Sequence, residues 1–145
     1  MKPKEFKCLH CHLTVYTDSS VSGVQNRNHC PYCLWSRHVD LEQAGDRLAA
    51  CQGMMRPVGL TMKRTRKKYG VEKQGELMLI HICVGCGKAS INRIAADDDA
   101  EKVFEIYQGY AKLDPATRTR LEESGIIALQ ASDKLVVQAQ LFGIK

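Results

Sequence analysis

The clearest hydrophobic pattern in the first hundred residues is the short apolar run from Glu76 to Cys83. Its length and its alternation at a period of two predict a β-strand. The alternation places these side chains on one face: Leu77, Leu79, His81 and Cys83. A second apolar stretch, Val58 to Met62, predicts a pairing strand, so the basic run at residues 63–68 is expected on an exposed hairpin loop.

After the aspartates at 97–99 the pattern changes to the spacing of helices. Acidic residues suit a helix N-terminus, and the apolar residues that follow at helical intervals are Val103, Ile106, Tyr107 and Tyr110. Asp114 with Pro115 predicts a second helix ending near Glu123. Ser132 is the predicted N-cap of a third helix, which ends at Gly143. Its predicted apolar stripe is Leu135, Val136, Ala139 and Phe142.

Three Cys-x-x-Cys pairs interrupt the part before these helices: Cys8/Cys11, Cys30/Cys33 and Cys83/Cys86. Each pair is typical of a zinc knuckle, a tight turn that points two thiolates at one metal ion. No apolar segment is long enough to span a bilayer, and the N-terminus lacks the apolar middle of a signal peptide. We therefore expect a cytoplasmic protein with reduced thiols, and close cysteine pairs then favour metal binding over disulfides.

The first two pairs, Cys8, Cys11, Cys30 and Cys33, have the spacing of a four-cysteine zinc site, with 18 residues between the pairs. A second site is expected from Cys51, His81, Cys83 and Cys86. His81 is preferred as its fourth ligand because strand alternation places it on the face of Cys83, and His38 is the alternative. The histidines beside ligand cysteines are interpreted as outer-shell donors or surface residues: His10, His12 and His29.

Composition and charge favour a nucleic-acid partner. Aromatic residues are sparse, which suggests that metal rather than core area stabilises the first ninety residues. Residues 1–96 carry 15 Lys/Arg against 7 Asp/Glu, whereas residues 97–145 carry 6 against 9. The basic half predicts binding to a polyanion. The candidate RNA contacts are Arg27, Arg37, Lys63, Arg64, Arg66, Lys67 and Lys68. The aromatic rings that can stack on unpaired bases are Tyr32, Trp35 and Tyr69, although the position of Trp35 just after a knuckle fits core packing equally well.

Enzymatic activity is not expected from these motifs. A nucleobase deaminase has His-x-Glu before Pro-Cys-x-x-Cys, whereas here His38-Val39-Asp40 follows the cysteine pair. A thioredoxin-like site needs a βαβ setting, which the pattern does not predict. Two alternatives to RNA binding stay open: a protein-interaction adaptor that acts through the helical tail, and a zinc-dependent enzyme with an open metal position.

These residues together resemble the RNHCP-domain family, whose motif stands here as Arg27-Asn28-His29-Cys30-Pro31. Further elements similar to the family follow in order, from Phe6-x-Cys8-x-x-Cys11 to His81-x-Cys83-x-x-Cys86-Gly87. The resemblance covers about residues 5–99 and implies a small zinc-binding domain. A link to RNA or the ribosome is an expectation drawn from small basic zinc ribbons, and neither the basic run nor the helical tail belongs to the family pattern.

The sequence thus predicts a small metal-stabilised, β-rich, zinc-ribbon-like domain at residues 1–96 and a C-terminal α-helical extension at 97–145. Its expected function is non-enzymatic: one or two Zn²⁺ ions hold loops that present a basic surface to structured RNA. Ribosomal RNA or a ribosomal subunit, with its proteins, is the expected partner, and no membrane association is expected.

Overall fold

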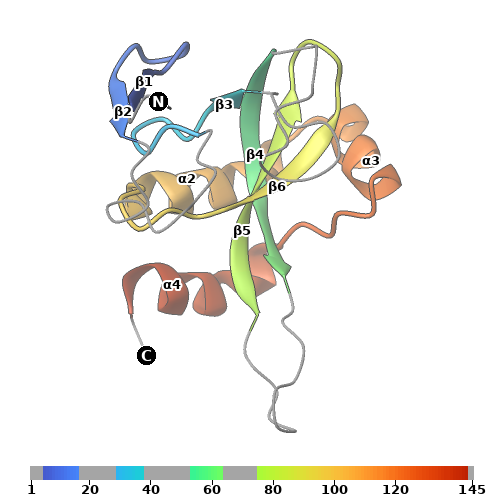
Figure 1. Ribbon diagram of the computed structural model, residues 1–145. Coiled ribbons are helices and arrows are strands. Elements are labelled where there is room, and N and C mark those ends of the chain that lie inside the picture. Colours follow the sequence, from blue (N-terminus) through green and yellow to red (C-terminus); the bar gives the residue numbers. More distant parts are fainter. Residues whose placement is uncertain (1–4, 17–28, 38–52, 64–74, 144–145) are drawn as a thin grey trace, which may run out of the picture.

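The computed structural model describes residues 5–16, 29–37, 53–63 and 75–143 (Figure 1). Two antiparallel sheets precede a helical C-terminal part. The strands are β1 (Glu5–Lys7), β2 (Thr14–Tyr16), β3 (Ser36–Arg37), β4 (Met54–Lys63), β5 (Glu76–Cys83) and β6 (Ala89–Arg93). The helices are α2 (Ala100–Gly109), the 3-10 helix η1 (Tyr110–Lys112), α3 (Pro115–Glu123), the 3-10 helix η2 (Ala131–Asp133) and α4 (Lys134–Phe142).

The larger sheet has the order β3-β4-β5-β6, and β1 pairs with β2 in a separate two-stranded sheet. The predicted strand Glu76–Cys83 is confirmed as β5, and its predicted partner lies within β4. The two strands pair from Met55 opposite Cys83 to Lys63 opposite Glu76. Every residue of β5 after Glu76 is buried, because β5 is central in the sheet and helices pack over it.

The first two helices begin where the sequence predicts. The Asp99 side chain accepts hydrogen bonds from the backbone N–H groups of Glu101 and Lys102, which caps α2. Asp114 caps α3 in the same way, with Pro115 in the first turn. No helix in the described part of the chain has the length and apolar character that a membrane crossing requires.

The third helix differs from its prediction in both its start and its buried face. It begins at Lys134 after η2, and Ser132 does not cap it. Val137 is fully buried and Leu141 packs beside it, whereas Leu135 is 81% exposed. The segment is apolar on more than one side, so contact with α2 decides which side turns inward. The predicted stripe of Leu135, Val136 and Phe142 is therefore wrong.

Sheet and helices share two hydrophobic clusters. In the first, Leu60 and Leu79 of the sheet pack against Val103 of α2 and Val137 of α4. In the second, the members are Val58, Ile80, Ile82, Tyr110, Leu121 and Ala128. The expectation that metal replaces a core throughout the first ninety residues is thus wrong for the large sheet. The helical extension predicted at 97–145 completes the core of this sheet.

The β1–β2 sheet is the part without an ordinary core. Its buried cluster consists of Val15, Cys8 and Cys30, with Phe6, Cys11 and Cys33 at its margin. Four of these six residues are cysteines, so little apolar area is removed from water here. This small unit lies beside β3 (Figure 1), and its stability must come from the cysteine side chains.

Candidate metal centre

All three Cys-x-x-Cys pairs adopt the same backbone turn. In each, the N–H of the first cysteine donates to the carbonyl five residues later, and the N–H four residues later donates back to the carbonyl of that cysteine. All six N···O distances are 2.9 Å. The fourth residue after the first cysteine has a positive φ: His12 at 66°, Leu34 at 67° and Gly87 at 79°. The predicted tight turn is therefore present at all three pairs.

The first two knuckles bring four cysteines together. Their Sγ atoms all lie within 4.8 Å of one another. Cys8 Sγ is 3.6 Å from Cys33 Sγ, and Cys11 Sγ is 3.5 Å from Cys30 Sγ. These separations are far longer than a disulfide bond. They are close to the roughly 3.8 Å between thiolates arranged tetrahedrally around a metal at about 2.3 Å, so the four side chains fit a metal ion.

The ionisation of these thiols also fits a cation between them. Burial raises the pKa of Cys30 to about 11, and it raises the pKa of Cys33 still further, with neighbouring thiolates adding to both effects. Burial opposes ionisation of Cys8 too, but backbone N–H groups of Cys11 and His10 bring its pKa below the ordinary value. A divalent cation between the four sulfur atoms would favour their thiolate form and offset the cost of burying negative charge.

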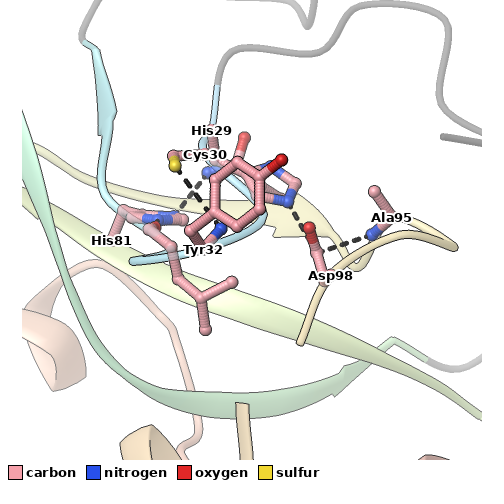
Figure 2. Close-up of polar contacts among 8 residues, drawn as sticks. His29, Cys30, Tyr32, His81, Ala95 and Asp98 are labelled. Atoms are coloured by element: carbon pink, nitrogen blue, oxygen red, sulfur yellow. Dashed lines mark hydrogen bonds and ion pairs between the residues drawn. The ribbon is translucent and has the colours of Figure 1, made fainter. Parts of the chain in front are cut away.

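His29 connects the second knuckle to helix α2 (Figure 2). Its Nε2 lies 2.7 Å from Oδ2 of Asp98, and both side chains are buried. The same carboxylate oxygen accepts from the N–H of Ala95, and the N–H of Asp99 donates to the carbonyl of Pro31. The His29 ring thus bonds to a carboxylate and orients the loop before α2 against the metal centre.

His81, a predicted ligand of the second metal site, has protein partners at both ring nitrogens. It is fully buried, and its Nε2 donates to the Leu34 carbonyl at 2.6 Å. Its Nδ1 accepts from the side-chain amide of Asn92 at 2.9 Å. Burial lowers the pKa of His81 to about 3, so the ring is neutral and both nitrogens are occupied. His81 thus faces the Leu34 carbonyl at the end of the second knuckle, and its role as a metal ligand stays a prediction.

The third knuckle stands at the end of β5. Cys83 is buried and Cys86 is exposed, and none of the six described cysteines forms a disulfide. Arg120 of α3 donates to the Gly87 carbonyl at 3.2 Å, which ties the helical part to this turn. The other predicted ligands of a second site, Cys51 and the alternative His38, lie outside the described residues.

A pair of stacked rings joins the first two knuckles. The imidazole of His10 lies parallel to the indole of Trp35, with ring centroids 4.3 Å apart and an interplanar angle of 7°. Trp35 is half-buried and belongs to no described hydrophobic cluster. The sequence marks Trp35 as a candidate for stacking but gives no signal that His10 is its partner.

The predicted RNA contacts are described only in part. Lys63 is exposed at the end of β4, and Arg37 is the last residue of β3. The predicted contacts outside the described residues are Arg27, Arg64, Arg66, Lys67 and Lys68. Lys63 is both the first residue of the basic run at 63–68 and the last residue of β4.

Sequence reasoning also missed residues that hold the site. Asp98 is 69 positions from His29, and Asn92 is on the strand beside His81. The three consecutive aspartates predicted a helix cap, and Asp99 forms that cap. They gave no indication that Asp98 contacts His29 in the interior. Only the pairing of β5 with β6 brings Asn92 to His81.

Neither the curated proteins nor the solved structures contain a significant match to the chain. The RNHCP domain matches residues 3–104, which is more than half of the chain and extends from β1 into α2. The matched range contains all three knuckles, His29 and its partner Asp98. The chain therefore belongs to the RNHCP domain family.

Proposed function

We propose that this protein is a cytoplasmic, non-enzymatic zinc-binding protein that binds structured RNA. The observation that carries the zinc assignment is the cluster of four Sγ atoms within 4.8 Å. Zn²⁺ favours tetrahedral coordination by thiolates, and four protein ligands leave no position for a substrate. A closed site of this kind stabilises a fold and presents loops, so the activity is binding rather than catalysis.

A second zinc ion is proposed at the third knuckle. The turn at Cys83 and Cys86 is of the same type as the two turns that form the four-cysteine cluster. It has equivalent backbone hydrogen bonds and a positive φ at the residue after the pair. Both ring nitrogens of His81 are hydrogen-bonded to Leu34 and Asn92. We therefore propose Cys51 and His38 as the remaining ligands of this second zinc ion.

Metal stoichiometry tests the two-site proposal. Wild-type protein is expected to carry two zinc ions per chain by native mass spectrometry. Cys86→Ser is expected to carry one, because serine does not replace a thiolate as a zinc ligand. Lys88→Ala, two residues away, is the matched control and keeps two. A single zinc in the wild type, unchanged in Cys86→Ser, would remove the second site.

The RNA assignment rests on charge. Residues 1–96 have eight more basic than acidic residues, and five of the six residues at 63–68 are Lys or Arg. Such a cluster binds phosphates by releasing counterions. Its first residue, Lys63, is paired with Glu76 at the end of the β4–β5 ladder. Ribosomal RNA within a ribosomal subunit is the proposed target.

Salt dependence of binding tests this proposal. The triple replacement of Arg64, Arg66 and Lys67 by alanine is expected to weaken binding to purified ribosomal RNA. It also lowers the slope of log affinity against log salt by about 2 to 3, since each phosphate contact contributes about 0.7 to 0.9. Replacing the exposed Lys112 and Lys134 of the helical part by alanine is the control. An unchanged slope in the triple variant would show that the basic run is not the contact.

One observation favours the alternative of a protein-interaction adaptor. The helical part exposes Ile127 by 83% and Leu135 by 81%, although it also packs on the sheet. Large exposed apolar side chains are common at protein interfaces. In that case Leu135→Ser abolishes capture of a partner protein and leaves RNA binding unchanged.

A further inference from the structure

The tips of the first two knuckles carry large apolar and aromatic side chains that make no core. Leu9 is 52% exposed, Leu13 is 49% exposed and Tyr32 is 51% exposed. Leu9 and Tyr32 lie between the cysteines of their pairs, and Leu13 follows the first pair. The cysteine cluster fixes these turns, so the positions do not need apolar side chains for packing. Exposed apolar groups gathered on two joined turns indicate a binding surface.

The His10–Trp35 pair gives this surface its geometry. The two rings come from different knuckles, and the four-cysteine cluster fixes the knuckles relative to each other. The stack is therefore held in position before any partner binds. His10 is exposed and Trp35 is only half-buried, so the stack presents ring surface to solvent. A further flat ring can extend the stack at about the separation that the two rings already have.

An unpaired nucleobase fits this position better than an apolar peptide. A base presents a π-face of the size of these rings, and stacking on aromatic side chains is how proteins hold unpaired nucleotides. Residues 1–96, which contain the pair, carry 15 Lys/Arg against 7 Asp/Glu. A phosphate backbone leading to the stacked base is thus electrostatically favoured, whereas an apolar peptide gains nothing from these charges.

We infer that the His10–Trp35 pair is a stacking platform for an unpaired base of the bound RNA, an inference that rests on the proposed RNA binding. The protein then reads a single-stranded segment at the knuckle tips, while the basic run contacts phosphates elsewhere. Recognition of bases is separate in location and in chemistry from the salt-dependent contact. The target is therefore an RNA that offers an unpaired nucleotide next to a helix.

Trp35 is the only tryptophan, so its fluorescence reports on the platform directly. The probes are a ten-nucleotide oligouridylate, an abasic strand of the same length, and a duplex of the same length. The oligouridylate is expected to quench Trp35, whereas the abasic strand and the duplex do not. Anisotropy of end-labelled strands is expected to show about five- to 150-fold tighter binding of the base-bearing strand than of the abasic strand.

Two substitutions make the test specific. Trp35→Leu is expected to bind both strands with the affinity of the abasic strand, while Trp35→Phe retains most of the preference because phenylalanine also stacks. Zinc content equal to that of the wild type shows that each variant is folded. If Trp35→Leu loses metal, His10→Ala replaces it as the test variant, because this substitution removes only an exposed ring. His10→Ala is expected to lose most of the preference for the base-bearing strand over the abasic strand.

The outcomes separate the two proposals. Equal affinity for base-bearing and abasic strands, or an unchanged preference in the metal-loaded variants, overturns the platform and leaves phosphate-based RNA binding intact. Absence of binding to either strand and to ribosomal RNA at near-physiological salt overturns the proposed function itself.

Discussion

Replacing Cys30 with serine is expected to unfold the metal centre while the large sheet stays folded. Metal binding contributes on the order of 10 kcal/mol to structural zinc sites, and the β1–β2 unit has no other substantial core. Its amides at residues 5–16 and 29–35 should therefore lose protection from hydrogen exchange. Amides of β4 and β5 should keep theirs, because the clusters around Leu60 and Ile80 include α2, α3 and α4.

A smaller loss is expected in the large sheet of the same variant. Leu34 follows the second knuckle and is fully buried in the first hydrophobic cluster. When the second knuckle unfolds, the Leu34 side chain leaves this cluster. The free energy of unfolding of the sheet should then fall by about 3 kcal/mol, as for a truncated core leucine. Lys7→Ala is the matched control, since Lys7 is exposed beside Cys8. Simultaneous loss of protection in β5 would contradict the view that the metal centre and the large sheet are stabilised separately. Retention of the metal by Cys30→Ser would contradict the assignment of Cys30 as a ligand.

Replacing His81 with leucine is expected to lower the free energy of unfolding by about 2 to 5 kcal/mol without removing metal. The change preserves apolar bulk but deletes both hydrogen bonds of the ring. The Leu34 carbonyl and the Asn92 amide then lose their partner, and each unsatisfied buried group costs about 1 to 3 kcal/mol. Urea denaturation measures the stability, and native mass spectrometry counts the zinc ions.

This result distinguishes a core histidine from a metal ligand. Arg93→Ala on the adjacent strand is the control, because it removes only an exposed ion pair with Glu76, worth less than about 1 kcal/mol. Loss of one zinc ion from His81→Leu would restore the sequence-based assignment. An unchanged metal count with a large loss of stability supports the hydrogen-bonded role.

The sequence alone determined the features that depend on neighbours along the chain. A Cys-x-x-Cys turn closes its hydrogen bonds within six residues, so its existence follows from local spacing. The caps Asp99 and Asp114 bond to backbone groups two or three residues away, and both helix starts were predicted for that reason. The four-cysteine cluster was predictable too, because two Cys-x-x-Cys pairs at this spacing supply the four thiolates of a tetrahedral zinc site.

The tertiary structure decided everything that depended on contacts between distant segments. Alternation along β5 placed His81 and Cys83 on one face, but it could not show that the Leu34 carbonyl and Asn92 occupy the ring. The buried face of α4 was undetermined locally, because apolar residues surround much of the helix and packing on α2 selected Val137. The contacts His29–Asp98 and His10–Trp35 join residues 69 and 25 positions apart. Local chemistry favours no particular partner for such side chains, so only the assembled core and the joined knuckles fix which groups meet.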